Sequence, residues 1–515
     1  MSEKYAIILT AGVGSRLKEL TDNSPKTLIK INDKPILDYQ IELYRNNGFN
    51  KIIIVTGYLS KMIENEYSKF NDIDIVVNEV YKTTNNMYSL NIGLEHLNNT
   101  YGYHQTWISN GDVIYESFNL SENNDSTISG IYVDKSQYFE ESMKIIIAYE
   151  KVKSISKKIS EEDYYGISMD MYKFTIDDIK TFHETIQGII QSGEMNQWTE
   201  VALQNMIENN KINFYPIEAT GTIWWEIDDK NDIIRAENRL NLLKNINKIK
   251  EINTFVYDMD GTINNGMLPI EGVEDFLRIN KINGINNIIL SNNSSYSKSG
   301  HQNRVKNIFE DQSLFNEIIS SNDQMIDKLK EDGIKKCYFL LPKDVIDEYE
   351  QNGILNEEID PDIVVAGFDK ELTYEKLEKA SIFIQNGLDY YLVHKDLRCP
   401  TENGFIPDAG SIVKALELTT NTKPKFIGGK PNREFIDYIL KKYNITQKRI
   451  AYIGDRFSTD MMIAINSDIM GMMVLSGEES LESYDKNKKQ YDKNNNIILI
   501  ESINFLNYFL NKHKN

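Results

Sequence analysis

Asp258 and Asp260, two carboxylates at the end of an apolar run, are the residues of this chain best placed to do chemistry. The run Phe255-Val256-Tyr257 predicts a buried strand that ends at Asp258, and Gly261 frees the backbone to bend just after it. Residues two apart share one face only while a strand continues, so here the turn sets the geometry of the pair. The first carboxylate can then attack a phosphorus atom while the second handles protons.

Three later segments, each after a predicted strand, supply partners for a transferring phosphoryl group. Ser291 offers a hydroxyl, and the adjacent Asn292 offers an amide. Lys430 can neutralise the phosphoryl charge, and Asp455 supplies an acidic ligand for Mg²⁺ with Asp460 in support. An isolated Asp-x-Asp pair is weak evidence, but four elements in this order predict a phosphoryl-transfer site.

A second phosphate site is predicted near the N-terminus, in Leu9-Thr10-Ala11-Gly12-Val13-Gly14-Ser15-Arg16-Leu17. Gly12 and Gly14 let backbone N–H groups approach phosphate oxygens, and Arg16 adds a fork of donors for a triphosphate. Many Gly-x-Gly segments are only turns, so the context matters. Lys26 follows in Ser24-Pro25-Lys26-Thr27-Leu28, and two distant carboxylates, Asp112 and Asp228, can jointly hold Mg²⁺ across the triphosphate.

Length and charge limit the classes of protein that fit. The chain has 515 residues, too many for one core, and a net charge of −20. An acidic surface argues against nucleic acid and against an anionic membrane as partners. We also expect no secretion signal, no membrane span and a cytoplasmic location, and neither Cys337 nor Cys399 belongs to a metal or disulfide pattern.

Strands that alternate with helical segments predict two α/β domains, each with a mostly parallel sheet. In the first, strands are expected at 5–10, 51–56, 73–77 and before Asn110, with antiparallel strands within 142–175. In the second, strands are expected at 286–291, 337–342, 362–366, 389–393, 425–427 and 450–453. The Lys- and Asn-rich segment 238–252 marks the boundary between domains 1–240 and 252–515, and the patch 485–496 is expected to be a solvated loop.

The second half resembles the haloacid dehalogenase superfamily of phosphatases, over 252–515. The resemblance rests on the four elements above, and Gly428-Gly429-Lys430-Pro431 and Gly454-Asp455-Arg456 point to its NagD-like group, as do segments 365–369 and 400–404. It implies a Rossmann-like core, 252–334 and 425–515, with an inserted α/β cap, 335–424. It also implies Asp258 as nucleophile, Asp260 as general acid/base, Ser291 and Lys430 as phosphoryl ligands, and Mg²⁺ on Asp258, the Asp260 carbonyl and Asp455.

The first half resembles nucleotidyltransferases that make activated sugars and alcohols, through Leu-x-Ala-Gly-x-Gly-x-Arg-Leu, Pro-Lys-x-Leu, Gly-Asp and Glu-Ile-Asp. It looks closest to the phosphocholine cytidylyltransferase type, through segments 85–90, 165–168, 198–200 and 224–228. The resemblance implies a Rossmann-like domain with a mixed, mostly parallel sheet. It implies nucleotide contacts from Leu9, Ala11, Gly12, Gly14, Arg16 and Lys26. It implies Mg²⁺ on Asp112 and Asp228. Thr10 and the absence of a proline in 18–21 depart from the pattern and argue mildly against a hexose 1-phosphate.

Residues for the smaller substrates are predicted less directly. The resemblance implies substrate contacts from Asn86, Tyr88, Trp198, Glu200 and Trp225 in the first half and from Asn292 in the second. Tyr88, Trp198, Trp224 and Trp225 are candidates for an aromatic cage around an ammonium group, or they pack in the core. His183, His301 and His394 have no partner pattern and are interpreted as structural or solvent-facing.

These observations favour a bifunctional enzyme that uses Mg²⁺ in both domains. One half would transfer CMP from CTP to phosphocholine, phosphoethanolamine or glycerol phosphate, and the other would hydrolyse a second small phosphate monoester, in one surface-glycan precursor pathway. Two alternatives stay open: a sugar-1-phosphate or phosphonate nucleotidyltransferase fused to a phosphatase, or one half that only binds. The phosphatase substrate and the oligomeric state, a homo-oligomer included, are not specified by these patterns.

Overall fold

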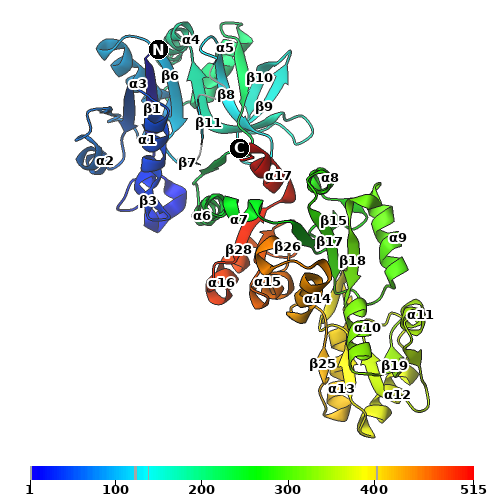
Figure 1. The fold of residues 1–515 in the computed structure, drawn as a ribbon. Coiled ribbons are helices and arrows are strands. Elements are labelled where there is room, and N and C mark those ends of the chain that lie inside the picture. The colour runs from blue at the N-terminus through cyan, green and yellow to red at the C-terminus, as the bar shows by residue number, and fades with distance from the viewer. Residues whose placement is uncertain (1–2, 117, 121–124, 137, 402–403, 515) are drawn as a thin grey trace. The chain divides into compact units, whose positions relative to one another are not determined.

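The structure is a computed structural model that describes residues 3–116, 118–120, 125–136, 138–401 and 404–514, so Glu402 and Asn403 of the predicted cap motif lie outside it. The chain forms two compact units (Figure 1). Unit 1 comprises Met1–Lys244 with Tyr508–Asn515, and unit 2 comprises Asn245–Asn507.

Unit 1 is built on one mixed sheet in the order β10-β9-β11-β6-β1-β4-β5, with β8 paired to β11 and β12 paired to β8. β6, β1, β4 and β5 run parallel, whereas β11 pairs antiparallel with β6, β8 and β9. The strands are β1 Lys4–Thr10, β4 Lys51–Thr56, β5 Ile73–Val77, β6 Gln105–Asn110, β8 Ser129–Asp134, β9 Lys144–Ala148, β10 Lys151–Ser156, β11 Gly166–Phe174 and β12 Phe214–Glu218.

Helices cover both faces of this sheet because the side chains of its central strands alternate between two cores. Tyr5, Ile7 and Leu9 pack on α3 Asn86–Thr100, and the same core takes in α4 Ile176–Gln191 and α5 Thr199–Glu208. Ala6 and Ile8 face the other core, with α1 Ile36–Asn46 and α2 Ser60–Tyr67. A central strand buried on both faces explains the unbroken apolar run of β1.

Shorter elements of unit 1 place the residues around the ends of the sheet. Two 3₁₀ helices, Ser15–Leu20 and Lys26–Leu28, follow β1. β7 and β13 form an antiparallel ribbon that brings the segment before Asp228 beside the segment after Asp112. The remaining elements are β2 Lys30–Ile31, β3 Lys34–Pro35, β7 Val113–Glu116, β13 Ile223–Glu226 and α6 Lys230–Lys244.

Unit 2 has a parallel sheet in the order β18-β17-β14-β26-β27-β28. Its strands are β14 Thr254–Tyr257, β17 Asn286–Ser291, β18 Glu317–Ser320, β26 Ile450–Gly454, β27 Met470–Val474 and β28 Ile497–Glu501. Its helices are α7 Ile246–Lys250, α8 Val273–Ile282, α9 Lys298–Ile308, α10 Ser321–Glu331, α14 Glu434–Tyr443, α15 Met462–Asn466 and α16 Leu481–Tyr491. The last helix, α17 Ile503–Lys512, begins in unit 2 and ends among the residues of unit 1. A hairpin of β15 Asn264–Asn265 and β16 Leu268–Pro269 follows β14, and 3₁₀ turns at Gln312–Leu314 and Gln447–Arg449 precede β18 and β26.

A second parallel sheet lies within unit 2, in the order β20-β19-β21-β22-β25. One face packs on α10 and α11 and the other on α12 and α13, with cores built from Val, Ile, Leu, Phe and Tyr. Its elements are β19 Lys336–Leu340, α11 Lys343–Gln351, β20 Leu355–Asn356, β21 Ile363–Ala366, α12 Tyr374–Gln385, β22 Tyr390–Leu392, α13 Ala409–Thr420 and β25 Phe426–Ile427, with a hairpin of β23 Arg398–Thr401 and β24 Gly404–Pro407.

The predicted fold class is confirmed: both units are α/β with mainly parallel sheets, and the expected strands form within two residues of their predicted ends. The prediction of a loop at 485–496 is wrong, because α16 extends to Tyr491. The Ser480 hydroxyl caps that helix and Leu481 and Tyr484 are buried beneath it, so packing outweighs the polar composition. Across the described residues, none of the helices is both long and apolar enough to cross a membrane.

Candidate active sites

The glycine loop after β1 lies at one end of a cavity of about 370 Å³ in unit 1. Six residues predicted to contact the nucleotide line this cavity: Leu9, Ala11, Gly12, Gly14, Arg16 and Lys26. Gly14 has φ 68°, and a Cβ there would stand 3.1 Å from Lys26 Cβ, so the turn needs glycine on both counts. β1 runs parallel to β4 on one side and to β6 on the other. The loop after β1 therefore lies at the carboxyl end of these strands, where ligands bind in parallel α/β sheets.

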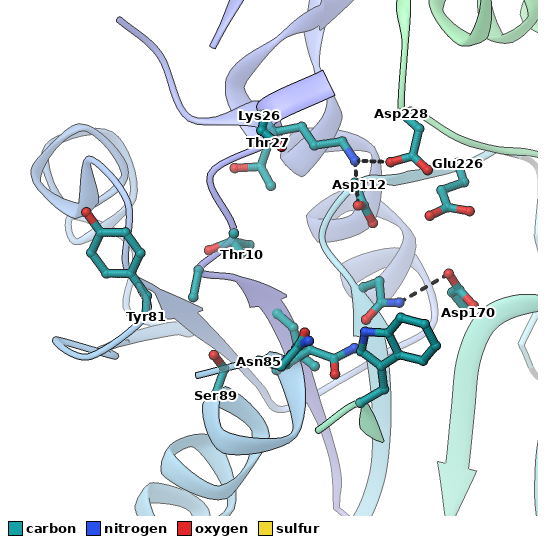
Figure 2. Close-up of a pocket in the computed structure, with 18 of the residues that line it drawn as sticks. Thr10, Lys26, Thr27, Tyr81, Asn85, Ser89, Asp112, Asp170, Glu226 and Asp228 are labelled. Atoms are coloured by element: carbon teal, nitrogen blue, oxygen red, sulfur yellow. Dashed lines mark hydrogen bonds and ion pairs between the residues drawn. The ribbon is translucent and has the colours of Figure 1, made fainter. Parts of the chain in front are cut away.

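Lys26 joins the two carboxylates that the sequence assigned to the metal (Figure 2). Its Nζ lies 2.6 Å from Asp112 Oδ2 and 2.8 Å from Asp228 Oδ1, and Arg16 contacts the other oxygen of Asp228 at 2.7 Å. Burial alone would lower the pKa of Lys26, but Asp112 and Asp228 raise it above its ordinary value. Burial opposes ionisation of Asp228, yet Lys26 and Arg16 hold its pKa below the ordinary value. Lys26 and Asp228 therefore each favour the charged form of the other.

The donors around Lys26 fit a divalent metal ion. Asp112, Glu226 and Asp228 each offer an oxygen, and these oxygens lie within 4.8 Å of one another. Asp112 Oδ1 is buried and accepts no hydrogen bond in the described structure, so it is available to an ion. Burial and then the neighbouring carboxylates of Asp170 and Asp112 raise the pKa of Glu226, while Lys26 opposes the rise. Carboxylate oxygens of this kind are ligands for hard divalent cations.

Two further buried acids, Asp170 and Glu200, also line the cavity. Asp170 sits at a bulge of β11 with φ 53°, where it accepts a hydrogen bond from Asn110 Nδ2 at 3.1 Å. Burial, then Glu200 and Asp112, raise the pKa of Asp170 to about 7. A left-handed non-glycine residue inside a strand is backbone strain of the kind that gathers at functional sites.

The predicted aromatic cage does not form. Trp198 lines the cavity, as do Asn86 and Glu200, but Tyr88 and Trp225 are not among the lining residues. Trp224 and Trp225 are buried and donate their indole N–H groups to Asp134 and Asp232. Their position in β13 explains this, since the strand packs them between elements of the core rather than toward the cavity.

In unit 2, three predicted residues emerge at one edge of the sheet. β14 runs parallel to β17 on one side and to β26 on the other. The carboxyl ends of these three strands, at Tyr257, Ser291 and Gly454, therefore lie next to one another. These strand ends bring Asp258, Ser291 and Asp455 to one edge of the sheet.

Lys430 occupies the centre of this second site. Its side chain is 4% exposed, and Nζ lies 2.6 Å from Asp258 Oδ1 and 2.6 Å from Asp460 Oδ1. Burial would lower the pKa of Lys430, but Asp258 and Asp460 hold it well above the ordinary value. Burial raises the pKa of Asp258 to about 7, with Asp460 and Asp455 adding to the rise and Lys430 opposing it. The lysine therefore favours the ionised form that a nucleophile needs.

Asp258, Asp455 and Asp460 form the acidic group that fits a metal ion, with ligand oxygens within 4.8 Å of one another. Glycines make room for it: a Cβ on Gly261 would lie 2.6 Å from Asp455 Oδ2, and one on Gly477 would overlap the same carboxylate. Burial, then the like charge of Asp460, raise the pKa of Asp455 to about 6, while Arg456 and Lys430 oppose the rise.

Asp260 lies apart from that group. Its side chain is 48% exposed, forms an ion pair with Arg304 and accepts a hydrogen bond from Asn264 Nδ2 at 3.0 Å. The half-exposed carboxylate is placed to exchange protons, while a metal role for this residue stays a prediction for its main-chain carbonyl.

The predicted substrate contact Asn292 is engaged within the protein. Its Oδ1 accepts from Lys430 N at 2.7 Å, and its Nδ2 donates to Asp396 Oδ2 at 3.0 Å. Ser291 is 6% exposed, and its hydroxyl oxygen accepts from Asn293 N at 3.2 Å.

Comparison with known families matches each unit to a different enzyme class. Residues 5–129 match the family model for nucleotidyl transferases, residues 255–355 match the model for haloacid dehalogenase-like hydrolases, and residues 427–497 match a further HAD-hydrolase-like model. The chain has an N-terminal nucleotidyl transferase domain and C-terminal haloacid dehalogenase-like hydrolase domains. It is an enzyme, with a transferase half and a phosphatase half.

Phosphatases are also among the individual proteins that the chain resembles. An acid sugar phosphatase of Staphylococcus aureus is 26% identical over 236 residues, 45% of this chain and 90% of that protein. A 4-nitrophenylphosphatase of Schizosaccharomyces pombe is 29% identical over 264 residues, 45% of this chain and 88% of that protein. The crystal structure of a 4-nitrophenylphosphatase from Thermotoga maritima is 31% identical and covers 50% of this chain and 97% of its own, with a TM-score of 0.47.

Several residues of these two domains escaped the sequence analysis. In the nucleotidyl transferase domain they are Asp170, Glu226 and Lys157, which line the cavity. In the hydrolase region they are Arg304, Asp396 and Asp408, whereas His394, interpreted from the sequence as structural or solvent-facing, is buried between those two acids. Asp170 left one signal, an acid within the fully buried strand 166–174, whereas a single arginine in the polar helix 298–308 left none.

Proposed function

We propose that the nucleotidyl transferase domain transfers CMP from CTP to a small phosphorylated alcohol with a cationic head, such as phosphocholine or phosphoethanolamine, and releases pyrophosphate. The observation that carries the proposal is a single cavity lined by the glycine loop with Arg16 and Lys26 and also by the buried carboxylates of Asp170 and Glu200. The loop suits a triphosphate, and Asp170 and Glu200 suit an ammonium group better than the neutral hydroxyls of glycerol phosphate or a sugar.

The transfer needs little more than alignment and charge balance. A phosphate oxygen of the acceptor attacks the α-phosphorus of CTP, and the bond from that phosphorus to the bridging oxygen breaks, so the electron pair leaves with pyrophosphate. Arg16 and Lys26 stabilise the charge on the phosphates. Asp112, Glu226 and Asp228 would hold Mg²⁺, which would offset the charge of the triphosphate.

We further propose that the hydrolase domain, 252–515, cleaves a phosphate monoester through an aspartyl phosphate. Asp258 forms a bond to phosphorus as the ester oxygen leaves with a proton from Asp260, and water then breaks the acyl phosphate after giving a proton to Asp260. Lys430 neutralises the phosphoryl oxygens. Asp258, Asp455 and Asp460 would hold Mg²⁺. The fusion of the two domains suggests one pathway that builds precursors of a surface glycan.

A substrate panel tests the transferase proposal. Pyrophosphate release would be measured with CTP, UTP, dTTP, ATP and GTP, each with phosphocholine, phosphoethanolamine, glycerol 3-phosphate and glucose 1-phosphate. The Asp258→Asn protein is the enzyme of choice, since its hydrolase cannot consume the acceptors. We expect release from CTP with the two cationic acceptors. Preference for UTP or dTTP with the sugar phosphate would replace the proposal with a sugar-1-phosphate nucleotidyltransferase.

Asp170→Asn tests the proposed binding of the ammonium group by the buried acids. Loss of the buried charge is expected to raise KM for phosphocholine about tenfold, equivalent to about 1.4 kcal/mol, and to leave KM for CTP unchanged. Asp163→Asn, on an exposed loop and bonded only to Ser160 among the described side chains, is the matched control. An equal rise in KM for CTP and phosphocholine would assign Asp170 to the nucleotide instead of the acceptor.

A further inference from the structure

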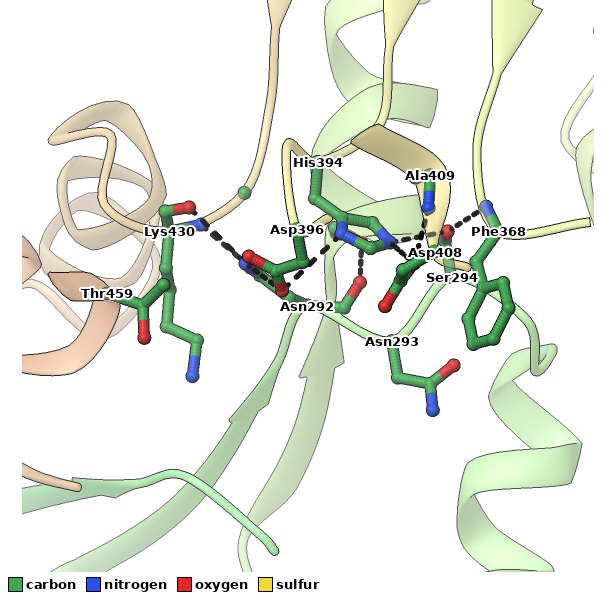
Figure 3. A network of polar contacts seen from close by, with 12 residues as sticks. Asn292, Asn293, Ser294, Phe368, His394, Asp396, Asp408, Ala409, Lys430 and Thr459 are labelled. Atoms are coloured by element: carbon green, nitrogen blue, oxygen red, sulfur yellow. Dashed lines mark hydrogen bonds and ion pairs between the residues drawn. The ribbon is translucent and has the colours of Figure 1, made fainter. Parts of the chain in front are cut away.

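A buried polar cluster beside the phosphatase site takes no part in the chemistry above. His394, Asp396 and Asp408 follow β22 and precede α13, and they contact Asn292 and Ser294 after β17 (Figure 3). His394 is fully buried, and the side chains of Asp396 and Asp408 are 15% and 7% exposed. Buried charges of this kind are costly unless they are paired, which raises the question of what they hold in place.

The imidazole of His394 lies between the two carboxylates of the cluster. Asp396 Oδ2 lies 3.5 Å from His394 Nδ1, whereas Asp408 Oδ1 lies 3.6 Å from Nε2. These carboxylates raise the pKa of His394 above its ordinary value although burial opposes the rise. Nε2 also contacts Ser294 Oγ at 2.9 Å, so the ring is held on one side by Ser294 and presents its other nitrogen to Asp396.

Asp396 in turn fixes the orientation of the Asn292 amide. Asp396 Oδ2 accepts a hydrogen bond from Asn292 Nδ2 at 3.0 Å, and this sets which end of the amide faces which partner. Oδ1 of Asn292 is thereby presented to Lys430 N at 2.7 Å, and Nδ2 also donates to Lys430 O at 3.3 Å. A flipped amide would place its NH₂ group against the N–H of Lys430.

The lysine loop passes close to both residues. A Cβ on Gly429 would lie 2.7 Å from Asn292 Oδ1 and 2.7 Å from His394 Cβ, so the loop is packed closely against both residues. The next residue, Lys430, carries the ammonium group that contacts Asp258 and Asp460. A small rotation of the Asn292 amide would therefore shift the Lys430 backbone, and with it the ammonium group that contacts the nucleophile Asp258.

We propose that Asp396, held by His394, is a positioning residue for Lys430 and acts through Asn292. The inference rests on the proposed role of Lys430 in the hydrolase domain. Asp396 touches neither Asp258 nor the transferred phosphoryl group; its function is to supply the acceptor that keeps the Asn292 amide in the orientation that the Lys430 backbone requires.

The test uses the full chain and 4-nitrophenyl phosphate. Asp396→Ala is expected to lower kcat by about ten- to a hundredfold, since a misplaced catalytic group costs about that much, with KM changed by less than about threefold. Asp396→Asn keeps an oxygen acceptor for Asn292 and should restore kcat to within about threefold of wild type. A merely structural role would show in the melting temperature of Asp396→Ala and not in this rescue.

A double-mutant cycle isolates the route of action. Because Asp396 acts through Asn292, the Asp396→Ala/Asn292→Ala protein should be no slower than Asn292→Ala alone. Asp408→Asn is the matched control: it keeps the cap on α13 at Ala409 N, does not contact Asn292, and should retain kcat within about twofold. If the losses in kcat of the two single variants multiply in the double variant, the inference is wrong. It is also wrong if Asp408→Asn is as slow as Asp396→Ala.

The Lys430→Ala variant tests the proposed role of Lys430 separately from the positioning role of Asp396. If Lys430→Ala retains wild-type phosphate release, the proposed role of the lysine is wrong. If Lys430→Ala is inactive while Asp396→Ala matches wild type, the lysine has its role and the positioning by Asp396 is wrong.

Discussion

Asp258→Asn should abolish phosphate release and leave nucleotidyl transfer intact. An amide cannot form the acyl phosphate, so we expect a loss of about four orders of magnitude or more in kcat, as when an enzyme loses its nucleophile. The substitution preserves the shape of the side chain beside Lys430, so the site keeps its packing. Release of 4-nitrophenol from its phosphate ester measures the first activity, and pyrophosphate release measures the second on the same preparation.

Asp275→Asn is the control for this variant, because Asp275 lies in the first turn of α8 and has no place in the site. It should keep both activities. An Asp258→Asn enzyme that still turned over the ester near the wild-type rate would show that another group attacks phosphorus.

Asp112→Ala should cut nucleotidyl transfer by about three to five orders of magnitude and spare the phosphatase. The variant loses a buried carboxylate oxygen that offers itself to a metal ion, so the triphosphate charge is left uncompensated. It also removes one of the two acids that hold Lys26. The readout is pyrophosphate release from CTP across a Mg²⁺ titration, which reports the loss of metal affinity together with the loss of rate.

Lys26→Ala is the companion variant and should cost less, about 2.7–4 kcal/mol, the usual effect of one transition-state donor. Asp72→Asn, which weakens only a surface pair with Arg45, is the matched control and should match wild type. Full transfer activity in Asp112→Ala would discard the metal-site assignment.

Strand ends made much of this molecule predictable. Asp258, Ser291 and Asp455 each follow an apolar run, and parallel strands place their carboxyl ends along one edge, so order along the chain sufficed to predict that they meet. The same reasoning applied to Gly12 and Asp112 after β1 and β6. The apolar runs predict the strands, and the parallel strands predict where the residues at their carboxyl ends lie.

Side-chain direction was beyond the same reasoning. Trp225 and Asp170 both lie in strands near the cavity, yet the first packs into the core and the second lines the cavity at a bulge. Which way a residue points depends on register and on a backbone angle such as φ 53° at Asp170, and neither is visible in composition. Partners such as Arg304 and Asp396 come from segments far away in sequence with no motif of their own.

The glycines around Asp455 bear on how this phosphatase can change over evolutionary time. Gly261 and Gly477 leave no room for even a methyl group next to that carboxylate, and Gly454 is closed in the same way by Asp460. Cap residues such as those of strand β24 are exposed and free to vary, so new substrates are accessible by mutation there. At these three glycines any side chain would collide with Asp455 or Asp460, so the positions around the reacting groups tolerate little substitution. Drift in this lineage should therefore alter what is hydrolysed long before it alters how.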